Sequence, residues 1–281
     1  MQSTIKSLLE NSIPFRFQPW VKKTYKRTRF FGFRYKCPFC KTFSRTFIPY
    51  GANFSVLKHL QVIGGGYRLN AECPVCGSFD RERLLFLYLL HKTDIFTRPR
   101  RLLHVAPETP LVNVFSQQNN LDYVTADLLA PDVMVKMDLT DIPFPDGAFD
   151  AIICNHVLEH IIDDRKAMSE LYRVLKPSGW AILQVPISLT LESTYEDFSI
   201  TTEKGREDAF GQGDHVRIYG KDYKTRLQQT GFKVDIFDWT AESTNFGGYK
   251  NLFSLIEDER LYVAKKSPRI VDISEKMLEQ N

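Results

Sequence analysis

The stretch Phe149-Asp-Ala-Ile-Ile-Cys-Asn-His-Val-Leu-Glu-His160 decides which fold is expected. Its first six residues are mainly apolar, which is typical of a buried strand. A helix is expected directly after this strand, at residues 157–161, and another at residues 164–175. A buried strand followed by a helix is the repeating unit of a parallel sheet. The stretch therefore predicts an α/β protein.

The same alternation continues on both sides of this stretch. Its order predicts a doubly wound sheet, a fold that binds ligands at the carboxyl ends of its strands. Asp127 and Asp138 each follow directly after an expected strand, so both are candidates for ligand contacts. Strands are expected at 101–105, 122–126, 133–137, 180–185, 232–237 and 260–264, and further helices at 80–91, 110–119 and 222–230.

Four segments in this order resemble the class I S-adenosylmethionine-dependent methyltransferases, especially the bacterial group with a V-L-E-H signature. The resemblance covers about residues 101–264 and implies a Rossmann-like methyltransferase domain with S-adenosyl-L-methionine as cofactor. The segments are Tyr123-Val-Thr-Ala-Asp127, Asp138-Leu-Thr-Asp-Ile-Pro-Phe144, Phe149-Asp150 with Asn155 to His160, and Leu175-Lys-Pro-Ser-Gly179.

The resemblance places the adenosine part of the cofactor at the second and third strands. Asp127, with Leu128 beside it, is expected to accept the ribose hydroxyls, as carboxylates do in dinucleotide-binding folds. Asp138 is expected to accept the adenine amino group, and Leu139 to pack near the ring. Without the resemblance, an aspartate after a strand is more often a cap or turn residue.

The methionine part is expected at the fourth strand. Asn155 and His156 leave this strand toward the cofactor and are assigned to it. Glu159 and His160 follow on the next helix, where core packing or capping explains them about as well as catalysis does.

The first loop departs from the pattern of the family. A glycine-rich loop is usual there, because missing side chains let the backbone approach the cofactor. This chain has His104, Ala106 and Glu108 in that loop, and we expect Ala106 to lack the positive-φ turn that glycine permits. A similar His-x-Ala-Pro-Glu loop in relatives assigns all three residues to a variant cofactor site. An inactive, methyltransferase-like binding module is the alternative.

Four of the five cysteines form two C-x-x-C pairs, which predict a structural zinc site. Four thiolates complete the tetrahedral coordination of a zinc ion, and a proline inside each C-x-x-C turn fits a tight knuckle. Disulfides and a redox pair are the alternatives. A strand at residues 42–48 and a turn at 49–51 are expected between the pairs, and Cys154 is expected in the core. The proposed ligands are Cys37, Cys40, Cys73 and Cys76.

Charge is unevenly distributed along the chain. The net charge is +3, yet residues 11–71 contain no acidic residue and twelve basic ones. This segment predicts a polyanionic partner, RNA being one possibility. The alternative is that the charge balances a thiolate–metal site or packs on an acidic body. The basic residues are Arg16, Lys22, Lys23, Lys26, Arg27, Arg29, Arg34, Lys36, Lys41, Arg45, Lys58 and Arg68.

The expected organisation is linear. A basic segment with the zinc-ribbon-like module spans residues 1–80, a linking helix 81–100, the methyltransferase domain 101–266 and a tail 267–281. Residues 1–10 do not resemble a secretory signal, and the longest apolar run, 84–90, is too short to span a bilayer. The expected location is the cytoplasm.

An acceptor lid is expected at residues 186–223, because this connection is long and rich in polar and aromatic residues. His215, Arg217 and Tyr219 alternate within it and would share one face of an extended segment. His215 is a candidate base, Arg217 a clamp for an anionic acceptor, and Tyr219 a stacking partner. The alternative is a lid salt bridge with Asp214 or Asp197 that holds the loop closed without chemistry.

The functional expectation is methyl transfer from S-adenosyl-L-methionine to an oxygen or nitrogen atom of a small-molecule or saccharide-type acceptor. Two alternatives stay open. One is an RNA methyltransferase that binds RNA through the basic zinc module. The other is a catalytically inactive, zinc-bearing binding module.

Overall fold

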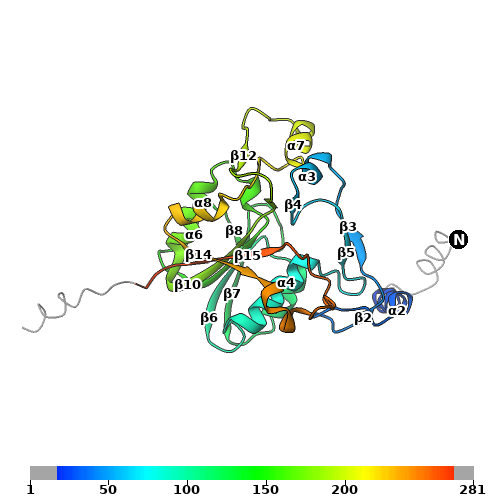
Figure 1. Cartoon of the computed structure of the whole chain (residues 1–281). Coiled ribbons are helices and arrows are strands. Elements are labelled where there is room, and N and C mark those ends of the chain that lie inside the picture. The colour runs from blue at the N-terminus through cyan, green and yellow to red at the C-terminus, as the bar shows by residue number, and fades with distance from the viewer. Residues whose placement is uncertain (1–17, 269–281) are drawn as a thin grey trace, which may run out of the picture. The chain divides into compact units, whose positions relative to one another are not determined.

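The computed structural model describes residues 18–268, and side chains from residue 24 onward. The chain divides into two compact units (Figure 1). The cysteine unit contains the described residues up to Ala52, together with Tyr67–Thr93 and Trp239–Glu259. The sheet unit contains Asn53–Gly66, Asp94–Asp238 and the described residues from Arg260. Of the expected segments, residues 1–17, with Arg16, and most of the tail lie outside the described residues.

The sheet unit is built on one seven-stranded sheet in the order β14-β15-β10-β9-β6-β7-β8. β15 is antiparallel to both of its neighbours, whereas the strands from β10 to β8 are parallel. This is the expected Rossmann-like α/β fold. The strands are β6 Arg100–Val105, β7 Leu121–Asp127, β8 Val135–Lys136, β9 Phe149–Asn155, β10 Leu175–Gln184, β14 Lys233–Asp238 and β15 Arg260–Lys265.

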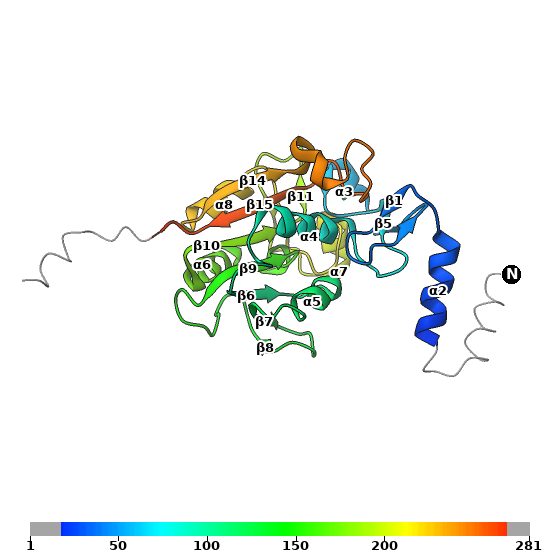
Figure 2. The ribbon, with the colours of Figure 1, turned by 90° about the horizontal axis from the view of Figure 1, so that it is seen from below.

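The central strands are buried because helices cover them. The side chains of β9 are almost all buried, as its apolar sequence predicts. Helices α6 (Asp164–Val174) and α8 (Tyr223–Gln229) lie side by side (Figures 1 and 2), and Arg226 donates to Asp164 between them at 2.9 Å. From β6 the chain runs outward to β7 and β8 and then crosses back to β9 on the other side of β6, so the strand order reverses between β6 and β9. In sheets of this kind, ligands bind at such a switch point.

Several expected elements are shorter than the sequence suggested. The helix after β9 is only a 3-10 turn, η2 (Leu158–His160). Helix α5 (Thr109–Phe115) ends before the polar residues 116–119, and β8 has two residues. β10 begins directly at the end of α6, with an irregular register between Leu175 and Trp180. Apolar patterning located these elements, but their ends depend on contacts distant in sequence.

The expected lid is tied to an earlier part of the chain. Its strand β11 (Ile187–Ser188) pairs with β4 (Val62–Ile63), and its strand β12 (Tyr195–Glu196) pairs with β13 (Arg217–Ile218). Its helix α7 (Glu203–Phe210) contacts α3 (Ser55–His59). Gly211 has φ +81°, and a Cβ there would lie 2.4 Å from Leu57 Cγ, so glycine is required at this contact. Residues 53–66 therefore belong to the sheet unit.

The cysteine unit is discontinuous in sequence. Lys36 N donates to Leu252 O at 2.8 Å, and Arg83 donates to the carbonyls of Phe253 and Ser254. The division therefore differs from the expected linear boundaries at 80 and 100, because residues 239–259 return to the cysteines. The elements are α2 Gln18–Phe30, β1 Tyr35–Lys36, β2 Phe43–Ser44, β3 Ile48–Tyr50, β5 Arg68–Glu72, α4 Asp80–Lys92 and η3 Trp239–Phe246.

Two further expectations concern the strand between the cysteine pairs and the absence of a membrane-spanning segment. The strand expected at 42–48 is split into β2 and β3, and β3 pairs with β5. Among the described residues, no helix combines the length and apolar character needed to cross a membrane.

Candidate cofactor site and metal-binding cysteines

A hydrogen-bonded chain of side chains links β6 and β9, near their carboxyl ends, to the middle of β7. His104 Nδ1 lies 2.9 Å from the Tyr123 hydroxyl, and His104 Nε2 lies 2.6 Å from Glu108 Oε2. Asn155 Nδ2 donates to the other Glu108 oxygen at 3.1 Å. The structure thus brings together three residues that the sequence assigned separately, and adds Tyr123, which sequence reasoning missed.

Glu108 is an ionised group in this chain. Burial by itself raises the pKa of its carboxyl. The hydrogen bond and charge of His104 and the amide of Asn155 lower this pKa by more than burial raises it. The net pKa lies below the usual 4.5. A negative charge is therefore fixed at the switch point between β6 and β9.

The backbone leaves β6 and β9 in the same way. Ala106 has φ +47° and donates from its N–H to Ala126 O, while His156 has φ +54° and donates to Gln184 O. The expectation that Ala106 cannot make a positive-φ turn is wrong. A left-handed alanine costs about 1–2 kcal/mol, and the hydrogen bond to β7 holds it there.

The carboxylates after β7 and β8 cap their own loops. Asp127 Oδ1 accepts from the N–H groups of Leu129 and Ala130, both at 2.7 Å. Asp138 Oδ1 accepts from the N–H and the hydroxyl of Thr140. Each aspartate thus uses one oxygen to fix its loop, as the cap interpretation predicts, and in the described residues no contact of the other oxygen is seen.

The two leucines assigned to the cofactor differ in exposure. Leu128 is 59% exposed, whereas Leu139 is 4% exposed and packs in the hydrophobic core of the sheet unit. The sequence did not distinguish them, because the turn that buries Leu139 depends on its contacts with Met137 and Ile142 in that core. An apolar surface for a ligand is available at Leu128.

One polar atom at the switch point lacks a partner. Asn155 Oδ1 is buried and has no hydrogen-bond partner among the described residues. Because buried carbonyl oxygens are nearly always paired, such an atom indicates a donor that binds there. The donor would lie beside the Glu108 carboxylate, so a cationic N–H donor fits this position.

The three lid residues are all buried, and all three contact the segment after β9. His215 lies against His160, with ring centroids 4.7 Å apart. Arg217 and Tyr219 contact backbone carbonyls of the same segment. Tyr219 donates to Asp164 Oδ2 at 2.7 Å and lies 3.3 Å from Leu158 O.

Arg217 uses its guanidinium inside the protein. Its Nη1 donates to Leu158 O at 2.9 Å and to Ile161 O, and its Nη2 donates to Ile162 O at 2.8 Å. Its Nε donates to Glu196 at 2.8 Å. The salt bridge of Arg217 is therefore formed with Glu196, its partner in the β12–β13 pair, whereas Asp214 lies 3.2 Å from His160. These contacts favour a role in holding the lid.

Glu159 is the centre of a histidine cluster. It is 1% exposed, and His156 Nδ1 lies 3.3 Å from its Oε1. Burial raises the pKa of Glu159, but His156 and the charges of His160 and His215 lower it to about 2. Burial lowers the pKa of His215 to about 4. At neutral pH the carboxylate is thus ionised and the His215 ring neutral.

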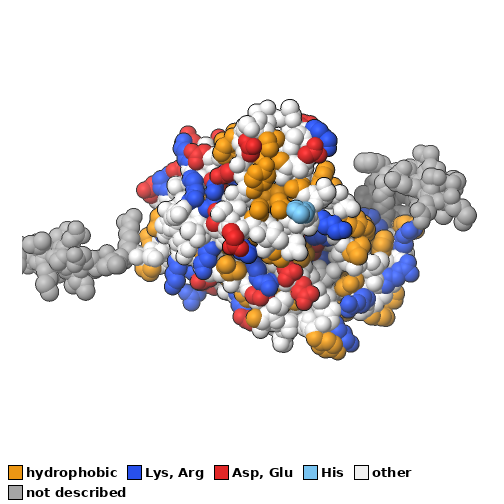
Figure 3. Space-filling model, turned by 45° about the horizontal axis from the view of Figure 1, so that its top comes forward, with side chains coloured by type: hydrophobic (Ala, Val, Ile, Leu, Met, Phe, Trp, Pro, Cys, Tyr) orange, Lys and Arg blue, Asp and Glu red, His pale blue; other side chains and the backbone are white. Residues whose placement is uncertain are grey.

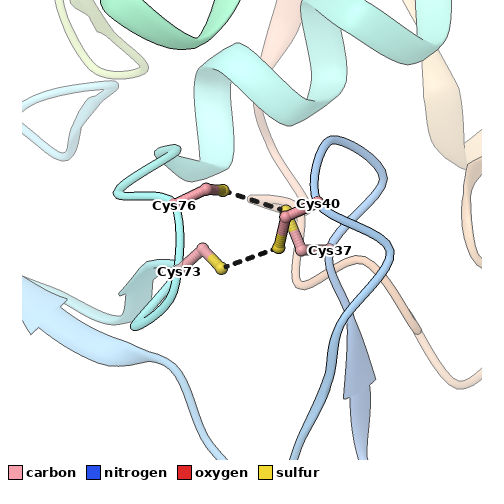
Figure 4. A group of neighbouring side chains, drawn as sticks. All are labelled: Cys37, Cys40, Cys73 and Cys76. Atoms are coloured by element: carbon pink, nitrogen blue, oxygen red, sulfur yellow. Dashed lines mark hydrogen bonds between the residues drawn. The ribbon is translucent and has the colours of Figure 1, made fainter. Parts of the chain in front are cut away.

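The four paired cysteines converge on one point (Figure 4). Cys37 Sγ lies 3.5 Å from Cys76 Sγ, and Cys40 Sγ lies 3.8 Å from Cys73 Sγ. A tetrahedral zinc ion with Zn–S bonds of about 2.3 Å holds its sulfurs about 3.8 Å apart. No disulfide joins these cysteines, and Cys154 is buried in the core of the sheet unit. The donor set fits zinc.

The two C-x-x-C turns are copies of one another. Lys41 N donates to Cys37 O, and Gly77 N donates to Cys73 O, both at 2.9 Å. Lys41 and Gly77 both have positive φ, +60° and +77°. The same backbone turn therefore forms with glycine in one copy and lysine in the other, so the spacing of the cysteines matters more than the glycine.

Arg83 is a buried cation beside the cysteines. It is fully buried, and among the described residues its guanidinium donates to backbone carbonyls, including Ala71 O and Ser78 O at 2.9 and 2.7 Å. A buried cation needs a nearby negative charge, and the Asp80 carboxylate is one such charge. Four thiolates around a divalent ion carry a net charge of about −2, so a metal-loaded site would add to it.

The comparisons with known proteins agree with this fold. Residues 97–183 match the family model described as a methyltransferase domain. The chain is 34% identical over 131 residues to the ubiquinone/menaquinone biosynthesis C-methyltransferase UbiE of Enterobacter sp. (strain 638), covering 45% of this chain and 48% of that protein. It is 29% identical over 136 residues to UbiE of Escherichia coli O1:K1, covering 43% and 50%.

Among solved structures, the chain is similar to the 1,6-didemethyltoxoflavin-N1-methyltransferase of Burkholderia thailandensis. The TM-score is 0.43 and the identity 14%, over 65% of this chain and 76% of that chain. The chain spans about half the length of the UbiE relatives that it matches. The sequence matches support an S-adenosylmethionine-dependent methyltransferase, and the matched residues contain β6 to β9 with their loops.

Proposed function

We propose that the protein is an S-adenosylmethionine-dependent methyltransferase that acts on a small molecule. The observation that carries this proposal is the unpaired Asn155 Oδ1 beside the Glu108 carboxylate at the switch point. The cofactor ends in an ammonium group, which would donate to both. The position lies within the segment that matches the methyltransferase domain.

The other assigned residues would hold the rest of the cofactor. The second oxygen of Asp127 would accept the ribose hydroxyls, and that of Asp138 the adenine amino group. Leu128 offers the apolar contact for the ring, since Leu139 is in the core. The left-handed turns at Ala106 and His156 direct the backbone away from the strand ends. When bound, the cofactor supplies an electrophilic methyl group on a sulfonium.

The acceptor is proposed to be a small-molecule or saccharide-type compound methylated on oxygen or nitrogen. The buried His215, neutral at neutral pH, could take a proton from such an atom. Apolar side chains gather on the face shown in Figure 3, and the lid exposes Leu189, Tyr195 and Phe198. These would contact an acceptor with an apolar part. The UbiE relatives are named C-methyltransferases, so carbon is the competing target atom.

Two measurements test this function. Isothermal titration with S-adenosylhomocysteine should show binding by the full chain, and binding should weaken in Asn155→Asp, which loses the amide donor to Glu108. Labelled methyl transfer into fractionated extract, separated into RNA, glycan and small-molecule pools, should label a small-molecule or glycan pool. No binding and no labelling would favour the inactive binding module.

The cysteine cluster is proposed to bind a structural zinc ion. Four sulfurs leave no coordination position for a substrate, so the ion stabilises the unit. Cys73→Ser should lose zinc by mass spectrometry and lower the thermal midpoint of the chain. The matched control Cys154→Ala removes a cysteine outside the cluster and should keep the zinc. A zinc content unchanged in Cys73→Ser would contradict the proposal.

An RNA substrate is the second candidate, and the surface of the cysteine unit favours it. Basic and aromatic side chains alternate there in the exposed part of residues 24–45. Aromatic rings stack on bases and cations bind phosphates. RNA binding that falls steeply with salt, and weakens in Phe33→Ala and Arg34→Ala, would support it. The exposed residues are Tyr25, Lys26, Arg27, Arg29, Phe31, Phe33, Arg34, Lys41 and Arg45.

A further inference from the structure

Glu159 is a buried carboxylate that lies among imidazole side chains. Neither of its oxygens has a partner in hydrogen-bond geometry among the described residues. Burying a carboxylate without hydrogen bonds is costly, so such a group is usually paired or bound to a metal. The side chain is 1% exposed, and the nearest groups are imidazoles.

Two of these imidazoles complete a ligand set. One ligand atom from each of Glu159, His160 and His215 lies within 4.8 Å of the other two. We propose that these three residues bind a divalent transition-metal ion, in a site separate from the cysteine cluster. Two histidines and one carboxylate are a donor set that binds Zn²⁺ and similar ions.

The distances require a small closure. A tetrahedral ion with bonds of about 2.1 Å holds its ligand atoms about 3.4 Å apart. Ligand atoms up to 4.8 Å apart reach that spacing when each side chain moves by roughly 1 Å, which rotation of the side chains supplies. The same neighbours therefore serve before and after an ion binds.

The second ring nitrogen of His160 already has the partner that a ligating histidine needs. His160 Nδ1 lies 3.2 Å from Asp214 Oδ2. Histidines that bind metals usually donate their other N–H to a carboxylate, which fixes the ring. This pairing leaves Nε2 of His160 as the nitrogen able to bind an ion.

The backbone holds the ligands together. Val216 N donates to Glu159 O at 3.0 Å, beside His215. Arg217 and Tyr219 bond the carbonyls of the segment that carries Glu159 and His160. The two buried lid residues are therefore positioning residues for this site. The hydrogen bonds between β13 and the η2 segment would thus keep the three ligands together.

Three protein ligands leave coordination positions open, in contrast to the four cysteines. An oxygen or nitrogen anion of an acceptor could bind there, next to His156. That chemistry rests on the proposed function, but binding of the ion does not. A test of metal binding alone therefore separates the failure of this site from the failure of the methyltransferase proposal.

The experiment uses the full chain with zinc already bound at the cysteines. Co²⁺ is added, and metal content after dialysis is measured by mass spectrometry. We expect one further ion per chain, with visible d–d absorption and no thiolate-to-cobalt charge-transfer band. Glu159→Gln, His160→Gln and His215→Gln should each lose this ion, with a loss of affinity of at least tenfold. His59→Gln, at an exposed histidine of the same unit, should retain it.

The result has clear opposites. A wild-type chain that binds no further ion, or a further ion retained by all three variants, would overturn the proposal. If a variant does not fold by circular dichroism, the wild type alone decides. Co²⁺ should then broaden the imidazole proton signals of His160 and His215 while that of His59 stays sharp, and an equal effect on all histidines would refute the site.

Discussion

His104 Nε2 and Glu108 Oε2 lie 2.6 Å apart, so the end of β6 and the loop after it share one buried hydrogen bond. The acidic side chain in the loop after β6 is thus held by a histidine of β6 itself. Side-chain hydrogen bonds thus hold this loop in place. Its charge faces Asn155, the residue that ends β9.

Stability should depend on the ionisation of Glu108. Its folded-state pKa is depressed, so its contribution is present above the usual 4.5 and is lost as the pH falls through the lower folded value. The free energy of unfolding of the wild type should exceed that of Glu108→Gln by about 1.5–3 kcal/mol at pH 7. The difference should shrink below about pH 4.5. Urea unfolding at several pH values measures it.

A control for that series is Asp141→Asn, at an exposed carboxylate of the same unit. Its difference from the wild type should be small at every pH. A gap between wild type and Glu108→Gln that widens toward acid would contradict the depressed pKa.

Asp127 should separate cofactor binding from loop stability. Asp127→Asn keeps an oxygen for the N–H groups of Leu129 and Ala130 but loses the charge. We expect it to weaken S-adenosylhomocysteine binding by about 1.5–3 kcal/mol, the value of a charge-assisted hydrogen bond. Isothermal titration gives the affinity. Asp132→Asn, at a nearby exposed residue, should bind like the wild type; equal affinity in Asp127→Asn would place the ribose elsewhere.

Ala106 should accept glycine. Its positive φ costs about 1–2 kcal/mol, while glycine adds about 0.5–1 kcal/mol of unfolded-state entropy. The two effects nearly cancel, so the free energy of unfolding of Ala106→Gly should lie within about 1 kcal/mol of the wild-type value. Ala126→Gly, in the adjacent strand at negative φ, gains no relief and should be less stable. Thermal unfolding ranks the two, and the reverse order would argue against the left-handed turn.

Removal of the Arg217 guanidinium should destabilise the chain strongly. Arg217→Met removes a donor from Glu196, which keeps Arg226, and from the carbonyls of Leu158 and Ile162, and breaking a buried charge pair costs about 3–5 kcal/mol. Arg217→Lys should restore little of this, because an ammonium cannot reach all of these acceptors. Chemical denaturation measures both. Lys204→Met, at an exposed lysine of the lid, should change the free energy of unfolding little. A loss as large as that of Arg217→Met would contradict the role of Arg217 in holding the lid.

The sequence predicted what depends on local patterns. The apolar run of β9, the aspartates after β7 and β8, and the two cysteine pairs could all be read from neighbouring residues. The carbonyl partners of Arg217 could not be predicted, because they lie some 55 to 59 residues earlier and no local pattern marks them. From the sequence, Arg217 was therefore assigned to the acceptor. The roles of the assigned site residues stay predictions.

Other misses have the same origin. The left-handed turn at Ala106 forms against the local preference of alanine, because β7 offers a hydrogen bond that only the assembled sheet contains. The two compact units differ from the expected linear boundaries because Leu252 pairs with Lys36, which no composition or spacing indicates. Tertiary contacts decide such features.

The return of residues 239–259 to the cysteine unit has a consequence for biosynthesis. A ribosome makes the chain from its amino terminus, and domains usually fold as soon as they emerge. The first and second cysteine pairs emerge early, but Leu252 and Phe253, which bond to Lys36 and Arg83, emerge only after the strands of most of the sheet. The nascent chain must therefore carry an incomplete cysteine unit through most of translation, and a fragment cut after residue 93 would lack part of that unit's own structure.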